Sequence, residues 1–250
     1  MAANFYETNK ALSEYLLFHY GKPEARFPKN LTGNFPARCV SENLDLKRLP
    51  KNARALDLGC AVGRSAFELA HHCGEVIAID NSAAFIAAAN KIRARRSLAF
   101  DFAVEGELVQ RAVARSSAGI ERSRVSFEEG DAMNLRPDIG SFDVVLMANL
   151  IDRLPDPRRC LAQLPNLVNP GGQLIITSPY TWLKAFTPRG KWLGGVKRGG
   201  RVTRTFDTLR EILSPHFKFS RRRDLFFLIR EHARKFQLGV SEATVWIRKS

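Results

Sequence analysis

The sequence predicts an α/β protein built around a mostly parallel sheet, and three observations carry this prediction. Short apolar segments alternate with segments of helical periodicity from residue 54 to residue 177, which is the pattern of successive βαβ units. Glycine or an acidic residue stands at the end of three of these apolar segments, as at the strand ends of a doubly wound sheet. The chain has 250 residues, 45% hydrophobic and 26% charged, which excludes collagen-like and disordered classes.

The first 50 residues are expected to form a helical cap or lid in front of the sheet. Residues 8–20 place apolar side chains at helical spacing, with Thr8 as the N-cap and Gly21 as the stop. A loop with proline and glycine follows, and residues 37–48 are expected to form a second helix. The main domain is then expected to span residues 51–250.

The main domain is expected to contain seven strands with helices between them. The expected strands are 54–58, 75–80, 125–128, 142–147, 173–177, 217–229 and 243–249. The expected helices are 65–73, 83–96, 157–167 and 207–213. Residues 97–121 interrupt the alternation and suggest an inserted strand and helix, while residues 180–203 suggest a long loop. Because only a short connection precedes the last strand, that strand is expected to be antiparallel to its partner.

Charge and cysteine content limit the binding partners and the cellular location that we expect. The net charge is +14, and residues 184–250 hold 17 Lys and Arg against 5 Asp and Glu. Such a basic face suits nucleic acid, an anionic small molecule or plain solvent exposure. The four cysteines show no C-x-x-C spacing, so we expect reduced thiols in a cytoplasmic protein, with no disulfide frame and no metal site. No apolar run reaches about 18 residues and no signal peptide is visible, so no membrane contact is expected.

The most specific motif lies between the first strand of the main domain and the helix that follows it. Asp57 stands near the end of the strand, and small residues follow at Gly59, Ala61 and Gly63. Small residues let the backbone turn tightly and approach a ligand closely. The motif therefore predicts a nucleotide-binding loop.

Acidic residues at the next two strand ends extend this site. Asp80 ends the second strand, next to Asn81, and a carboxylate there can accept hydrogen bonds from both ribose hydroxyls. Asp131 follows the third strand, next to Ala132, and can accept from an adenine amino group. Since parallel strands end at the same edge of a sheet, the three sites are expected to form one nucleotide site.

This arrangement resembles the class I methyltransferases that use S-adenosyl-L-methionine (SAM), whose glycine loop, ribose acid and adenine acid match these positions. The resemblance implies a Rossmann-like fold, a seven-stranded sheet with an antiparallel last strand, and SAM as cofactor. The chain departs from many relatives at Ala61, where they have glycine. A Rossmann dehydrogenase would need G-x-G-x-x-G, which is absent from this loop.

Several longer segments resemble one methyltransferase family in particular. They resemble the ovothiol-pathway enzymes, which methylate an imidazole nitrogen of 4-mercaptohistidine, also called 5-thiohistidine. The resemblance implies an N-methyltransferase of ovothiol A biosynthesis, with a separate sulfoxide synthase or lyase that inserts the sulfur. The segments are 5–8, 13–21, 35–39, 147–154, 177–182, 230–237 and 243–246.

Candidate residues follow for the remaining roles. Arg38 is expected to bind the carboxylate of the cofactor's methionine part through a charge-assisted bond. Asp152 and His232 are candidate bases, and Asp152 or Glu14 is a candidate to orient the acceptor ring. A purely structural role stays open for each of them. Asn149 is expected to contact the cofactor and the acceptor, and the full set of expected acceptor-binding residues is Tyr6, Tyr15, His19, Asn149, Tyr180 and Arg230.

Two alternatives from other classes stay open. The first is an RNA methyltransferase that uses the basic C-terminal third, and its binding would weaken steeply with salt. The second is a SAM-binding protein without catalysis, which would need a blocked acceptor pocket. The expected partner is a small molecule, thiohistidine, rather than a nucleic acid.

Overall fold

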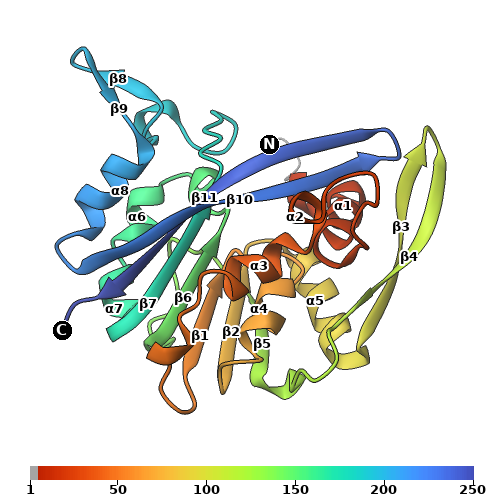
Figure 1. The fold of residues 1–250 in the computed structure, drawn as a ribbon, viewed down its shortest axis with the longest axis horizontal. Helices are drawn as coiled ribbons and strands as arrows, with labels where there is room; N and C mark the ends of the chain where they lie inside the picture. The colour runs from red at the N-terminus through yellow and green to blue at the C-terminus, as the bar shows by residue number, and fades with distance from the viewer. Residues whose placement is uncertain (1–4) are drawn as a thin grey trace.

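The protein, seen here in a computed structural model that describes residues 5–250, is built on one seven-stranded sheet (Figure 1). The strand order is β10-β11-β7-β6-β1-β2-β5. The strands are β1 (Arg54–Leu58), β2 (Glu75–Asp80), β5 (Val125–Glu129), β6 (Phe142–Ala148), β7 (Val168–Ser178), β10 (Phe217–His232) and β11 (Lys235–Arg248). Strand β11 is antiparallel to both β7 and β10, while β7, β6, β1, β2 and β5 pair in parallel. The structure confirms a mostly parallel sheet with an antiparallel last strand.

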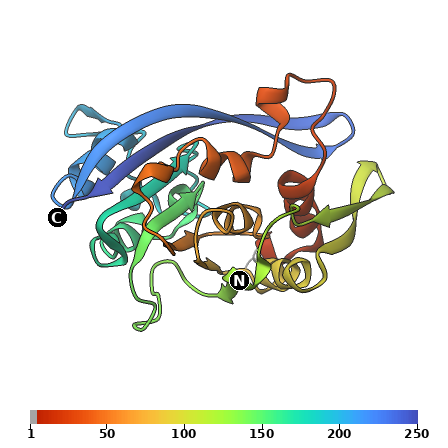
Figure 2. The ribbon, with the colours of Figure 1, turned by 60° about the horizontal axis from the view of Figure 1, so that its bottom comes forward.

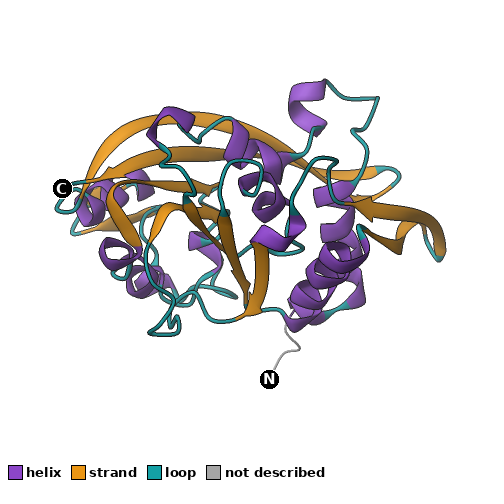
Figure 3. Cartoon of the chain, turned by 90° about the horizontal axis from the view of Figure 1, so that it is seen from below, coloured by secondary structure: helices purple, strands orange, loops and turns teal. Residues whose placement is uncertain are grey.

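Helices cover both faces of the sheet (Figure 3). Alternate residues of one strand enter different cores: Ala55 packs in one cluster, and Leu56 and Leu58 pack in the other. This alternation gives the strands apolar side chains on both faces, as parallel sheets require. The helices are α1 (Asn9–Tyr20), α2 (Lys29–Thr32), α3 (Phe35–Ser41), α4 (Arg64–Leu69), α5 (Ala83–Arg95), α6 (Pro157–Leu161), α7 (Leu164–Leu167) and α8 (Thr205–Leu213).

Helix α1 begins and ends where the sequence predicts. The Thr8 hydroxyl accepts a hydrogen bond from the Ala11 backbone N–H at 3.2 Å, and Gly21 follows the last turn. No residue with a side chain fits at position 21, because a Cβ added to Gly21 would lie 2.3 Å from the Leu17 carbonyl oxygen. The second predicted helix is shorter than expected: α3 ends at Ser41, and a separate 3₁₀ turn, Leu46–Arg48, begins where the Asp45 carboxylate accepts from the Lys47 N–H.

The prediction of a strand and a helix over 97–121 is wrong. The segment forms a hairpin of two antiparallel strands, β3 (Ser97–Glu105) and β4 (Leu108–Arg115). Gly106 allows the tight turn, with φ of +53°. Burial alternates along β3 from Leu98 onward, with larger apolar side chains on the more buried face, and this period of two is that of a strand.

Other boundaries also differ from the predictions. The helix expected over 157–167 is divided into α6 and α7, and the second of these starts with a proline near its first turn. The long loop over 180–203 contains a small hairpin, β8 (Val196–Arg198) and β9 (Arg201–Thr203).

Strands β10 and β11 extend far beyond the rest of the sheet and pass over the N-terminal helices (Figures 1 and 2). At the tip of this hairpin, the Ala233 N–H donates to the Val104 carbonyl of β3 at 3.0 Å. Helix α1 therefore lies beneath one long hairpin and beside the other. This arrangement encloses the edge of the sheet where β1, β2, β5, β6 and β7 end.

Candidate functional site

A cavity of about 570 Å³ lies at the carboxyl ends of the parallel strands. Ligands of open α/β sheets bind at this edge. Its floor consists of residues at or just after the carboxyl ends of five strands: Gly59, Ala61, Asp80, Asn81, Gly130, Asp131, Ala132, Ala148, Asn149, Pro179 and Thr181. Its roof comes from the N-terminal segment and the long hairpin: Tyr6, Tyr15, Phe18, His19, Phe35, Pro36, Phe227, Ile229, Leu238 and Gly239.

The glycine loop makes the tight turn that its small residues predict. Gly59, Ala61 and Gly63 all have positive φ, of +74°, +47° and +87°. A Cβ added to Gly59 would lie 2.8 Å from Leu150, and one added to Gly63 would lie 2.5 Å from the Phe127 ring. Ala61 adopts the same left-handed region with a side chain, at a conformational cost of about 1–2 kcal/mol. The loop thus brings its backbone to the cavity, although Gly63 itself does not line it.

Asp80 and Asp131 are held by backbone N–H groups at the cavity wall. The two Asp80 carboxylate oxygens accept from the N–H groups of Ala61 and Ser82, each at 2.9 Å. Asp131 accepts from the N–H of Met133 at 2.8 Å. Burial raises the pKa of the Asp80 carboxyl above its usual value, although these N–H groups act against the shift. Both carboxylates keep lone pairs for the hydroxyl or amino groups of a nucleoside.

Two buried groups of opposite charge beside the glycine loop each keep one polar atom without a hydrogen bond to any described residue. Asp57 accepts from the Ser65 hydroxyl at 2.6 Å through one oxygen, while no described residue bonds to its other oxygen. Burial raises the pKa of the Asp57 carboxyl to about 7. Arg64 donates from Nε to Asn34 at 3.2 Å, and its Nη1 is buried with no acceptor among the described residues. Arg64 also forms an ion pair with Glu68, with Nη2 3.5 Å from Oε2. The remaining Asp57 oxygen can accept from an ammonium group and Arg64 Nη1 can donate to a carboxylate, and these are the two charged groups of an amino acid.

The structure does not bring Arg38 to the cavity. Its Nε donates to Glu42 at 2.6 Å, and its Nη1 donates to the Phe226 carbonyl at 3.1 Å. Arg64 does not line the cavity either, but it lies beside the glycine loop, and the sequence analysis did not single it out. The signal was available, because Arg64 directly follows the last glycine of the loop and opens α4.

Three of the expected acceptor residues meet in the roof of the cavity. Tyr6 and Tyr15 pack edge to face, with ring centroids 5.9 Å apart. His19 is 6% exposed, and its Nδ1 has no hydrogen-bond partner among the described residues. Burial, with a smaller contribution from the Arg64 charge, lowers the pKa of the His19 imidazole to about 3. The roof therefore presents a neutral imidazole. Tyr180 does not line the cavity, and its hydroxyl donates to Glu242 at 3.1 Å.

Asp152 does not line the cavity; its side chain is buried, and both of its carboxylate oxygens accept hydrogen bonds. It accepts from the Ser178 hydroxyl at 2.9 Å, from the Thr181 N–H at 3.1 Å and from Arg153 Nη1 at 2.8 Å. Arg153 and Thr181 do line the cavity, and Arg153 is the one Lys or Arg among the described lining residues. Asp152 is thus placed to position Arg153 rather than to contact a ligand, and the sequence did not single out Arg153.

Glu14, Arg230 and His232 meet in a second cavity, of about 620 Å³, on the other side of α1. Tyr15 faces the first cavity while Glu14 faces the second, because neighbouring residues of a helix point about 100° apart. Arg230 is paired with Glu24, and His232 Nδ1 accepts from the Arg234 N–H at 3.3 Å. The structure therefore does not bring these three predicted residues to the strand ends.

Residues 5–250 contain no helix with the length and apolar character needed to cross a membrane. All four cysteines, Cys39, Cys60, Cys73 and Cys160, are free and buried. Burial raises the pKa of the Cys39 and Cys160 thiols to about 12, so these thiols are protonated and unreactive at neutral pH.

Comparison with known proteins places the same region in one family. Residues 49–206 match the model of a family described as a methyltransferase domain, and this range includes the glycine loop, Asp80, Asp131 and Asn149. The ubiquinone biosynthesis O-methyltransferase of Coxiella burnetii is 24% identical over 159 residues, which are 64% of this chain and 56% of the relative. The norajmaline N-methyltransferase of Rauvolfia serpentina is 26% identical over 149 residues, which are 57% of this chain and 43% of the relative. The chain thus spans about half the length of these curated relatives.

Solved structures agree on the fold. The N-methyltransferase NodS from Bradyrhizobium japonicum superimposes with a TM-score of 0.50 at 17% identity, and the match covers 79% of this chain and 86% of that one. A likeness at this identity concerns the fold alone, and the site must be argued from its own residues.

Proposed function

The chain belongs to the methyltransferase domain family, and we propose that it is a SAM-dependent enzyme that methylates an imidazole nitrogen of 4-mercaptohistidine, as in ovothiol A biosynthesis. SAM is the cofactor, and Asp57, Arg64, Asp80 and Asp131 are the residues that we propose to hold it. Curated relatives include both O- and N-methyltransferases, so transfer to nitrogen is part of the proposal.

One observation carries the choice of acceptor. The segments that resemble the ovothiol-pathway enzymes are scattered along the sequence, yet three of them, 5–8, 13–21 and 35–39, converge on the roof of the cavity. Their contribution is aromatic or apolar apart from the neutral imidazole of His19. A cavity of about 570 Å³ has the size of a small-molecule site, which suits a cofactor and a small aromatic acceptor.

The main contribution of the protein to this methyl transfer is to position the reacting atoms. When bound, SAM supplies a sulfonium methyl, whose carbon–sulfur bond breaks with its electron pair on sulfur as the new nitrogen–carbon bond forms. The attacking ring nitrogen uses its lone pair, and the other ring nitrogen releases its proton afterwards. Tyr6 and Tyr15 would stack against the acceptor ring, and His19 would accept a hydrogen bond from its N–H. Holding the nitrogen about 3 Å from the methyl supplies much of the rate enhancement.

The N-terminal segment is proposed to act as a lid over residues 51–250. Three contacts tie it to the cofactor loops. The Tyr20 hydroxyl donates to the Val62 carbonyl at 2.8 Å, the Ser82 hydroxyl donates to the Tyr6 carbonyl at 3.1 Å, and the Ala84 N–H donates to the Glu7 carboxylate at 3.3 Å. Because these contacts join the lid to the glycine loop and to the start of α5, closure of the lid and order in the cofactor loops are expected to be linked.

The proposed reaction also implies an earlier reaction that supplies its acceptor. The acceptor carries sulfur on its imidazole ring, so a separate reaction must first form that carbon–sulfur bond on histidine. The buried, protonated thiols are compatible with a reducing compartment, which supports the expected cytoplasmic location.

Turnover by the purified chain tests the proposal. SAM is supplied with thiohistidine, plain histidine or bulk RNA, and products are identified by mass spectrometry with fragmentation that separates N-methyl from S-methyl isomers. The proposal expects N-methylthiohistidine as the main product and a much lower rate on histidine. Equal rates on histidine and thiohistidine, or methyl transfer only to RNA, would refute it.

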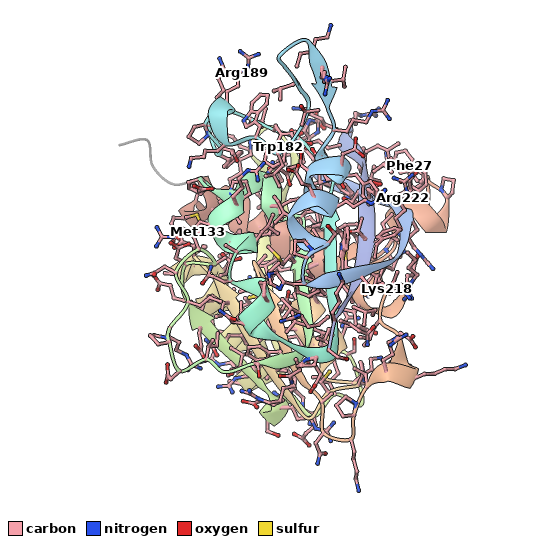
Figure 4. The ribbon with its side chains drawn as sticks, turned by 90° about the vertical axis from the view of Figure 1, so that its left-hand side faces the viewer. Phe27, Met133, Trp182, Arg189, Lys218 and Arg222 are labelled. Atoms are coloured by element: carbon pink, nitrogen blue, oxygen red, sulfur yellow. The ribbon has the colours of Figure 1, made fainter. Side chains whose placement is uncertain are left out.

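An RNA acceptor is the second candidate, and the exposed segment after β7 favours it. Residues Lys184, Arg189, Lys197, Arg201 and Arg204 of this segment are exposed, and Thr181, Ala185 and Phe186 of the same segment line the cavity. Figure 4 shows Arg189 near the top of the view, above Lys218 and Arg222 of β10. If RNA is the acceptor, its affinity falls steeply between 50 and 200 mM salt, roughly as counterion release predicts. Thiohistidine turnover should change little over that range.

A further inference from the structure

Asn149 has a left-handed backbone conformation on the floor of the cavity. It directly follows β6, lines the cavity and has φ of +52°. The left-handed region costs a residue other than glycine about 1–3 kcal/mol, and strain of this kind concentrates at ligand sites. The surroundings of the Asn149 side chain indicate what this conformation achieves.

Two buried hydroxyls hold the Asn149 side chain from neighbouring strands. Thr177 of β7 donates to Asn149 Oδ1 at 2.9 Å, and Ser241 of β11 donates to the same oxygen at 2.8 Å. The Thr177 hydroxyl also accepts from the Asn149 backbone N–H at 3.1 Å, so its own proton is available for Oδ1. Two donors on one amide oxygen set the rotation of the amide group. Nδ2 is therefore turned away from both strands.

The amide nitrogen of Asn149 is left with its donors unused. No described residue accepts a hydrogen bond from Nδ2, and the atom is not among the fully buried ones. The side chain is half-buried and borders the cavity, so the NH₂ group faces the space where ligands bind. An amide NH₂ only donates, and its partner must be a lone pair or an anion.

The acceptor that we propose carries such an atom beside its nucleophile. Its thiolate is softer and more nucleophilic than its ring nitrogen, so the enzyme must keep sulfur away from the methyl group. Arg153 is a poor candidate for this task, because it already donates to Asp152 and to the Thr181 carbonyl at 3.0 Å and lies over the Phe186 ring. Asn149 offers a neutral, rigidly oriented donor at the end of β6 instead.

We propose that the Asn149 amide binds the sulfur of the acceptor, and that Thr177 and Ser241 are the positioning residues that aim it. A hydrogen bond to the thiolate lowers its nucleophilicity and turns the ring nitrogen toward the methyl. Asn149 thereby determines both the preference for a thiolated ring and the choice of nitrogen over sulfur. This inference rests on the proposed function.

Variants of Asn149 test the proposal through selectivity. Asn149→Ala is expected to lower kcat/KM for thiohistidine by about tenfold or more, while that for histidine changes by less than about threefold. The share of S-methyl product should rise. Asn149→Asp keeps the size and the bonds from both hydroxyls but places an oxygen where the NH₂ was, and its loss should exceed that of alanine. The affinity for S-adenosylhomocysteine, measured by calorimetry, should stay within about threefold in both variants.

A matched pair of serine variants tests the positioning role. Ser241→Ala removes one of the two donors and should raise the share of S-methyl product less than Asn149→Ala does. Ser126→Ala is the control, since that serine lies on β5 and donates only to the Val76 carbonyl, at 3.5 Å. It should leave the product ratio unchanged. Thermal melts show that each variant is folded before its kinetics are compared.

Several results would overturn the inference. An unchanged preference for thiohistidine and an unchanged product ratio in both Asn149 variants would do so while leaving the proposed function intact. A loss of S-adenosylhomocysteine affinity in place of selectivity would assign the amide to the cofactor. Absence of thiohistidine methylation by the wild-type chain would remove the proposed function and this inference with it.

Discussion

The two halves of the cavity are built in different ways. The cofactor half consists of turns that directly follow β1, β2 and β5, so each of its groups stands next to the strand that places it. Apart from Asn149, the half that we propose for the acceptor is lined by α1, α3 and the β10–β11 hairpin, which come from opposite ends of the chain. The first half therefore depends on local backbone chemistry, and the second depends on long-range packing. Variants that affect one half and spare the other sharpen this distinction.

The largest expected effect comes from the glycine loop. Gly63→Ala adds a Cβ 2.5 Å from the Phe127 ring at a residue with φ of +87°, so both overpacking and backbone strain oppose it. We expect the free energy of unfolding to fall by about 2–5 kcal/mol, measured by urea denaturation. Gly171→Ala is the control, because φ is +79° there and nothing lies within 4 Å of an added Cβ. Equal losses in the two variants would show that packing against Phe127 contributes nothing.

Asp80→Ala should weaken SAM binding by about 1–3 kcal/mol, because it removes the acceptor for the ribose hydroxyls and the partner of two loop N–H groups. Asp80→Asn keeps one acceptor oxygen and should lose less. Calorimetric titration measures both variants, with Asp138→Ala as the control, since that side chain is 81% exposed. Unchanged affinity in Asp80→Ala would remove Asp80 from the cofactor site.

Variants of Arg64 and Arg38 compare the structural and the sequence-based assignment of the cation that binds the cofactor. Arg64→Gln should weaken SAM binding by about 1–2 kcal/mol, because Arg64 pairs with Glu68 through Nη2 but keeps Nη1 without an acceptor beside the glycine loop. Arg38→Gln should leave the affinity for SAM unchanged, because Arg38 is paired with Glu42 and the Phe226 carbonyl. The reverse order of the two affinities would restore the sequence-based assignment.

The smallest expected effect concerns pH and the acceptor half. The His19 pKa is about 3 in the folded protein and about 6.5 in the unfolded chain, so the unfolded chain binds the proton first as the pH falls. The stabilising contribution is complete above pH 6.5 and decreases below it, by about 1.4 kcal/mol between pH 7.5 and pH 5.5. His19→Gln should lack this decrease when urea denaturation is compared at the two pH values. Opposing groups such as Asp57 titrate in both proteins and cancel in the difference. Parallel pH curves for the two proteins would contradict a buried, neutral His19.

Much of the cofactor half was accessible from the sequence. A strand that ends in a small-residue turn, followed by a strand that ends in an acid, leaves few alternatives for where Gly59 and Asp80 lie. Strands β1 and β2 have the predicted ends, and both residues line the cavity. The position of Arg64 directly after this turn was a usable signal, but its burial could not be predicted, because an arginine in a helical segment gives no sign of burial.

The acceptor half was accessible only in part. Aromatic residues of the N-terminal helix were expected near the acceptor, and Tyr15 and His19 do line the cavity. Glu14 was expected beside them, yet it faces the second cavity, because a rotation of one residue along a helix changes the face. Arg230 and His232 were expected in a loop after a strand, but β10 and β11 continue through them and carry them past the cavity.

Fold class, strand order along the chain and the nucleotide-binding turns follow from residue pattern alone, because hydrophobic periodicity and glycine conformations act within a few residues. Folding of the whole chain decides the rest: which face of α1 meets the cavity, which arginines find carboxylate partners, and how Thr177 and Ser241 come to orient Asn149. Those outcomes depend on contacts between residues far apart in sequence. The energies of such contacts are set by burial and geometry, which no local pattern encodes.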